Sequence, residues 1–186
     1  MLEILFHGRG GQGAVTAANL LVAAALKDGH KGVQAFPLFG SERRGAPVKA
    51  FARISDADVD LRSQIYNPDI VVVVDPGLLQ LVNVTDGLKP DSVLILNTTG
   101  KPGDFEFSKA FRVATVDAAA IAINHKLLVG GIPIINTPIL GAIPRVTKLV
   151  SIEAIESAIK EQWKGEAGER NALAAREAYE QTEVNR

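Results

Sequence analysis

The stretch FHGRGGQGA, residues 6–14, carries four glycines. It follows the apolar run LEILFH (2–7) and precedes AVTAANLLVAAALKDG (14–29), where apolar residues recur at helical spacing. Three of the glycines have the spacing G-x-G-x-x-G, namely Gly8, Gly10 and Gly13. The order strand, glycine loop, helix is the opening unit of a layered α/β domain.

A loop this rich in glycine lets another molecule approach the backbone closely. Glycine has no Cβ and accepts positive φ, and the first amides of a helix lack internal partners. A ligand phosphate or the backbone of a partner protein could therefore lie against this loop. We expect Arg9 and Gln12 to project from it and to bind an anion or an amide. Tight packing of strand on helix would also explain the spacing, but the additional Gly11 favours close approach.

The same glycine spacing occurs in dinucleotide-binding domains, which make a further demand on the sequence. An acidic residue should end the second strand, roughly 20 residues after the loop, and bind the ribose hydroxyls. No Asp or Glu stands between Gly29 and Ser41, and Lys31 is the only basic residue placed to bind a 2′-phosphate. The sequence therefore disfavours a nicotinamide dinucleotide.

A second polar loop follows the candidate strand at residues 32–36. It reads LFGSERRGAP (38–47) and has the pattern of neither a helix nor a strand. Its central residues are Ser41, Glu42, Arg43, Arg44 and Gly45. Because loops at the carboxyl ends of parallel strands share one rim, we expect it beside the glycine loop. Arg44 would then bind a phosphate or carboxylate, unless Glu42 pairs with an arginine at the surface.

Apolar runs further along the chain predict the remaining elements. The alternation in VKAFARIS (48–55) predicts a strand with one exposed face, whereas IVVVVDP (70–76) is typical of a parallel strand covered on both faces. Further strands are predicted at 92–99 and 111–118. Helices are predicted from 118 through His125, from Thr137 with Pro138 in first position, at 151–163 with Ser151 as N-cap, and at 169–179.

Together these elements predict an α/β fold: a Rossmann-like, open, mainly parallel sheet flanked by helices, with further helices at the C-terminus. We expect a single domain over residues 1–186, with the tail beyond about residue 181 frayed.

Polar residues close several of the predicted strands. Asp75 is expected to accept hydrogen bonds from loop amides or to contact a ligand, and capping explains Asn136 or Thr137. His7 has no evident partner in the sequence and is interpreted as structural. No nucleophile motif, P-loop lysine or paired carboxylates are present, so no catalytic residue is assigned.

The composition excludes several classes of protein. The net charge of −1 argues against binding to nucleic acid or an anionic membrane. There is no cysteine to hold an iron–sulfur cluster, and the three histidines do not have metal-ligand spacing, so no metal site is predicted. The apolar runs are too short to cross a bilayer, and MLEILFHG does not predict a signal peptide. We expect a cytoplasmic protein.

Four segments in combination resemble the gamma subunit of 2-oxoacid:ferredoxin (acceptor) oxidoreductases of the pyruvate and 2-ketoisovalerate type. They are FHGRGGQGAVTAANLL, AFPLFGSERRGAPVKAFARIS, PDIVVVVD and INTPILGA, and the resemblance spans essentially the whole chain. It implies one subunit of a complex that oxidatively decarboxylates a 2-oxoacid to its acyl-CoA. Alpha, beta and ferredoxin-like delta subunits, or fused equivalents, would be its partners.

The resemblance also implies how the cofactors are divided. Thiamine diphosphate and the 4Fe-4S clusters would lie on partner subunits, so this chain alone would hold no cofactor and would be inactive. Its part would be assembly contacts and a share of the coenzyme A path. The resemblance implies that the rim formed by the two loops faces the ligand or a partner subunit. The residues it assigns to that rim are Gly8, Arg9, Gly10, Gly11, Gln12, Gly13, Arg43 and Arg44. The sequence does not separate an aliphatic from an aromatic oxoacid, nor identify the electron acceptor.

Two other functions stay open at this stage. A free-standing nucleotide-dependent oxidoreductase would bind a dinucleotide by itself. A purely structural assembly module would use the glycine loop only against partner backbone.

Overall fold

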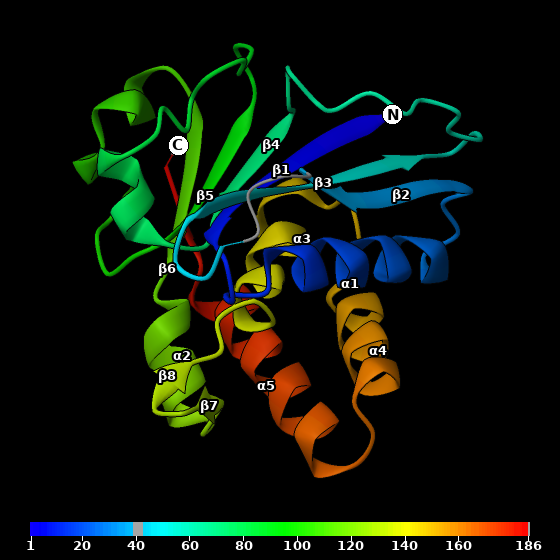
Figure 1. Cartoon of the computed structure of the whole chain (residues 1–186), viewed down its shortest axis with the longest axis vertical. Helices are drawn as coiled ribbons and strands as arrows, with labels where there is room; N and C mark the ends of the chain where they lie inside the picture. The colour runs from blue at the N-terminus through cyan, green and yellow to red at the C-terminus, as the bar shows by residue number, and fades with distance from the viewer. Residues whose placement is uncertain (39–42, 186) are drawn as a thin grey trace.

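A computed structural model describes residues 1–38 and 43–185, so Ser41 and Glu42 of the second predicted loop lie outside the described residues. A seven-stranded mixed sheet in the order β2-β3-β1-β4-β5-β6-β9 forms the centre of the fold (Figure 1). Its strands are β1 (Leu2–Arg9), β2 (Gly32–Pro37), β3 (Pro47–Ser55), β4 (Ile70–Val73), β5 (Val93–Asn97), β6 (Arg112–Val116) and β9 (Glu183–Val184).

The helices and short turns connect these strands. The α-helices are α1 (Ala14–Lys27), α2 (Ala118–Asn124), α3 (Ala142–Thr147), α4 (Ile152–Gln162) and α5 (Glu166–Gln181). Short 3₁₀ helices are η1 (Pro76–Gln80), η2 (Pro102–Asp104), η3 (Glu106–Lys109) and η4 (Pro138–Gly141). A separate hairpin pairs β7 (Leu128–Val129) with β8 (Ile132–Pro133). Ser151 caps α4 as predicted, because its hydroxyl accepts from the amide of Ala154.

The sheet confirms the predicted α/β class and has a parallel centre. β1, β4, β5 and β6 run parallel to one another, whereas β3 is antiparallel to both β1 and β2. Since β2 therefore runs in the same direction as β1, the two strands end at the same edge of the sheet. β3 nevertheless lies between them, which displaces the end of β2 from the place where a dinucleotide-binding fold needs its acidic residue.

The two faces of the sheet are covered differently. Below the sheet in Figure 1, α1 and α3 lie against one apolar face, which includes Phe6, Val72 and Ile95, and α4 and α5 pack beneath these two helices. The alternate residues of the same strands, such as Leu5 and Val73, face a second cluster. Loops and 3₁₀ turns cover that second face. β4 is buried on both faces, as its continuous β-branched run predicts.

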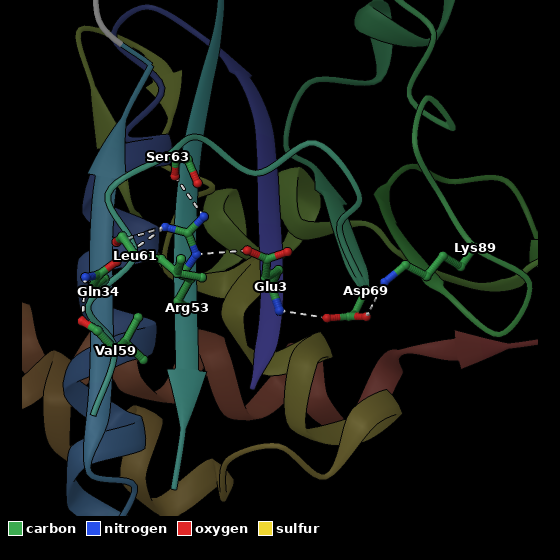
Figure 2. Close-up of polar contacts among 8 residues, drawn as sticks. All are labelled: Glu3, Gln34, Arg53, Val59, Leu61, Ser63, Asp69 and Lys89. Atoms are coloured by element: carbon green, nitrogen blue, oxygen red, sulfur yellow. Dashed lines mark hydrogen bonds and ion pairs between the residues drawn. The ribbon is translucent and has the colours of Figure 1, made fainter. Parts of the chain in front are cut away.

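The prediction that residues 48–55 have an exposed face is wrong. β3 is an interior strand, and its residues 50–54 are all buried. Arg53 is the clearest case, with a side chain only 1% exposed. Its Nε donates to Glu3 Oε1 at 2.8 Å and its Nη2 donates to the carbonyl of Ser63 at 2.8 Å (Figure 2). The Arg53 guanidinium thus links the segment around Ser63, which follows β3, to Glu3 on β1.

The C-terminal segment beyond residue 181, which the sequence predicts to be frayed, contains the short strand β9. β9 pairs antiparallel with the edge strand β6, with Thr115 opposite Glu183 and Ala114 opposite Val184. The side chain of Asn185 accepts from the amide of Val113 at 2.7 Å. These bonds, which join residues far apart in the sequence, connect the end of the chain to the edge of the sheet.

Candidate functional site

The glycine loop connects the end of β1 to the start of α1. Gly13 stands at the N-cap position with φ of 78°, in the left-handed region, and no side chain caps the helix. Within residues 1–38 and 43–185, the amides of Gly11, Gly13 and Ala14 find no hydrogen-bond acceptor. The loop therefore presents backbone donors at the positive end of a helix dipole.

The second loop lies against the glycine loop, as predicted from the shared rim. The amide of Gly10 donates to the carbonyl of Ala46 at 2.9 Å, and the amide of Gly45 donates to the carbonyl of Gly10 at 3.0 Å. Gly10 and Arg44 form an isolated parallel bridge. Backbone hydrogen bonds thus hold the two loops together at the carboxyl edge of the sheet.

A cleft of about 470 Å³ opens between these loops. Of the predicted site residues, it is lined by Arg9, Gly10, Gly11, Gly13 and Arg44, whereas Gly8, Gln12 and Arg43 do not line it. It is also lined by residues that were not predicted as site residues: Ala14, Val15, Pro37, Leu38, Val48 and Lys49. One wall is thus backbone and cation, and the rest is largely apolar.

Arg9 and Gln12 find their hydrogen-bond partners within this chain. The Nε of Arg9 donates to Oδ2 of Asp75 at 3.1 Å, and Nε2 of Gln12 donates to the same oxygen at 2.6 Å. Gln12 also accepts from the amide of Arg9 at 2.7 Å. Both side chains are bound to the end of β4 instead of projecting freely. Asp75 accepts from one loop amide as expected, that of Gly77.

Lys49 is the cleft cation that sequence reasoning missed. It lies on β3 directly opposite His7 on β1, and it lines the cleft with Arg44. The signal was available, because Lys49 stands at the start of the strand that follows the arginine loop. An alternating strand pattern, however, assigns such a lysine to solvent by default.

The side chain of His7, which the sequence analysis interprets as structural, lies on β1 beneath the glycine loop. The side chain is buried, and this burial, assisted by the positive charge of Lys49, lowers the pKa of His7 to about 4. The imidazole is therefore neutral at physiological pH. Because this ring is neutral, the positive charges along the cleft are those of the three basic residues that line it, Arg9, Arg44 and Lys49.

Asn136 and Thr137 do not cap the following helix. The hydroxyl of Thr137 donates to Oδ1 of Asn171 on α5 at 2.6 Å, and no side chain caps η4. Asn136 lies against the glycine loop, so that a Cβ on Gly13 would be 2.5 Å from its Nδ2. These residues bring the segment before η4 under the start of α1.

Neither a metal centre nor a membrane span is found in the part of the chain that the structure describes. No group of three or more His, Asp or Glu side chains there could hold a metal ion. None of the helices among these residues is long and apolar enough to span a membrane.

These observations define a class: an open α/β domain with a cleft at its carboxyl edge that is lined by the backbone of a glycine loop and by basic side chains. The comparisons with known proteins then give the family. The model of the pyruvate ferredoxin/flavodoxin oxidoreductase family matches residues 3–181, and this chain belongs to that family.

Its relatives are similar over their full length. The chain is 54% identical over 187 residues to the pyruvate/ketoisovalerate oxidoreductases common subunit gamma of Pyrococcus furiosus, covering 99% of this chain and 98% of the relative. Among solved structures, pyruvate oxidoreductase subunit PORC of Thermotoga maritima is 40% identical, with a TM-score of 0.82, covering 100% and 98% of the two chains.

A third likeness shows the fold alone. The 2-oxoglutarate:ferredoxin oxidoreductase of Magnetococcus marinus is 20% identical with a TM-score of 0.76, over 96% of this chain and 30% of the other. The same fold therefore also occurs as one part of a longer chain.

Proposed function

We propose that this chain is the gamma subunit of a multi-subunit oxidoreductase that converts pyruvate or ketoisovalerate to its acyl-CoA. The full-length similarity to gamma subunits that bear those substrates in their names carries the proposal. The partners would be alpha, beta and ferredoxin-like delta subunits, and the complex would work in the cytoplasm. In this reaction the bond between C1 and C2 breaks, carbon dioxide leaves, two electrons pass to a low-potential carrier and coenzyme A forms the thioester.

The residues of this chain do not fit the redox cofactors. It has no cysteine to hold a cluster, and the described residues contain no metal-binding group that could accompany thiamine diphosphate. Thiamine diphosphate, which supplies carbanion stabilisation, and the 4Fe-4S clusters would therefore lie on the partner subunits.

The cleft supports a share in binding coenzyme A. The backbone amides at the start of α1 that find no acceptor among residues 1–38 and 43–185, together with Arg44 and Lys49, suit a phosphate group. The apolar wall formed by Val15, Leu38 and Val48 suits a less polar part of the same ligand. The 2-oxoglutarate:ferredoxin oxidoreductase of Magnetococcus marinus, which shares the fold, was solved with coenzyme A bound.

Arg44→Ala in the assembled complex tests this share. We expect the KM for coenzyme A to rise about tenfold, with kcat at saturating coenzyme A and the KM for the oxoacid unchanged, since losing one charged hydrogen bond at the low end of the range costs about 1.5 kcal/mol. Arg112→Ala, which removes an exposed arginine from β6, is the control. An unchanged KM for coenzyme A would reduce the chain to an assembly module.

Two further measurements test the proposed subunit role. The purified chain should show no pyruvate-dependent reduction of ferredoxin, and activity should appear only when the partner subunits are added. Calorimetry of the purified chain with NAD or NADP should give no binding. Binding of either one would favour the free-standing nucleotide-dependent oxidoreductase instead.

A further inference from the structure

We propose that Asp75 is the positioning residue of the glycine cleft, an inference that rests on the proposed function for its effect on coenzyme A. Asp75 stands just beyond β4, a central strand that is buried on both faces. Its carboxylate gathers three donors. Oδ2 accepts from Arg9 at 3.1 Å and from Gln12 at 2.6 Å, and Oδ1 accepts from the amide of Gly77 at 2.9 Å.

These bonds fix the glycine loop from within. The Oε1 of Gln12 accepts from the amide of Arg9 at 2.7 Å, while the Nε2 of the same side chain reaches Asp75. The two ends of the loop are thereby closed on one carboxylate that is anchored to the sheet. Charge-assisted hydrogen bonds of this kind are among the strongest that side chains form.

The same carboxylate also reaches the opposite wall of the cleft through Arg9. While its Nε is bound to Asp75, the Nη1 of Arg9 donates to the carbonyl of Gly45 at 3.1 Å. Gly45 adjoins Arg44, the cation that lines the cleft. Asp75 thus sets the position of both walls, although it does not itself line the cleft.

If Asp75 has no positioning role, its negative charge alone predicts that removing it lowers the KM for coenzyme A. A carboxylate near an anion site repels the anion, so its removal alone would tighten the binding of coenzyme A. With a positioning role, removal releases Arg9 and Gln12, loosens both loops and weakens binding. The direction of the change in KM therefore distinguishes the two.

The test uses the whole complex carrying Asp75→Ala, Asp75→Asn or the control Asp86→Ala, which removes an exposed carboxylate. We expect Asp75→Ala to raise the KM for coenzyme A about tenfold, with kcat unchanged. Asp75→Asn keeps an acceptor oxygen and should restore most of the affinity. Because Asp75 acts through Arg9, adding Arg9→Met to Asp75→Ala should change the KM little further.

Hydrogen exchange gives a readout that does not depend on coenzyme A. Asp75→Ala should increase amide exchange in residues 8–14 and 43–46 and leave α5 unchanged. Unchanged exchange in both loops, or a lower KM for coenzyme A, would overturn the inference. If the complex with Asp75→Ala does not assemble, Asp75→Asn is used in its place. The same changes in amide exchange and in the KM for coenzyme A are then expected, with a smaller size. Faster exchange with a normal KM in Asp75→Ala and Arg44→Ala would instead refute the coenzyme A role and leave the positioning role intact.

Discussion

A Cβ placed on Gly10 would lie 2.2 Å from the carbonyl oxygen of Arg43. No side chain can occupy that space, so the contact between the glycine loop and the arginine loop depends on the missing side chain at this position. The backbone bonds of Gly10 to the 45–46 segment require the same closeness. Gly10 is therefore needed for the walls of the cleft to meet, whatever ligand enters it.

Gly10→Ala should separate the two loops. We expect the free energy of unfolding to fall by about 1–3 kcal/mol, since the neighbouring atoms are backbone and can move only with the whole loop. The KM for coenzyme A of the complex should rise as well. Gly103→Ala is the control, because a Cβ there meets nothing within 4 Å. Equal stability of the two variants in urea denaturation would contradict this account.

Arg53→Met should destabilise the fold without touching the cleft. It leaves Glu3 without its partner and releases the carbonyl of Ser63, so we expect a loss of about 3 kcal/mol in the free energy of unfolding. Limited proteolysis should then cut within residues 56–68 first. Lys89→Met, which removes an exposed ion pair to Asp69 in the same view (Figure 2), should cost less than about 1 kcal/mol.

Thr137→Val tests the bond that holds the segment beneath α1. The variant keeps the shape of the side chain but leaves Oδ1 of the buried Asn171 without its donor, so we expect a loss of about 2 kcal/mol. Thr85→Val is a close control, because Thr85 makes the same type of bond to Asn83 at 2.7 Å at the surface. Denaturation should show little change for Thr85→Val; similar losses for both variants would count against the role of burial.

The sequence predicts those parts of the site that depend on local pattern. The strand, glycine loop and helix at residues 2–27 are local. The second loop follows directly on β2, which runs in the same direction as β1 and so ends at the same edge. The partners of Arg9 and Gln12 are not local, since Asp75 lies more than sixty positions away along the chain. The local pattern therefore predicts only that both side chains project from the loop and bind an anion or an amide, without naming Asp75 as the partner.

The error at β3 has a similar physical origin. Alternation in residues 48–55 resembles a strand with one solvated face, and Arg53 fits that pattern. Its burial comes from Glu3 and from the segment around Ser63, which are remote in sequence or fold back over the sheet. A buried and paired arginine has the same sequence signature as an exposed one, so this position could not be predicted from the pattern alone.

His7 should make stability fall in mild acid. Burial and the charge of Lys49 lower the pKa of His7 to about 4. Between about pH 6.5 and pH 4 the imidazole is therefore protonated in the unfolded chain but neutral in the folded chain. The free energy of unfolding should therefore be unaffected by His7 above pH 6.5 and fall progressively below it, by up to about 3 kcal/mol at pH 4. His7→Gln should flatten this part of the profile. Lys49→Met, which removes the smaller cause, should shift the midpoint of the His7 imidazole signal in NMR upward but keep it below 6.5. A midpoint at or above 6.5 in the unmodified chain would show that the ring is not desolvated in solution.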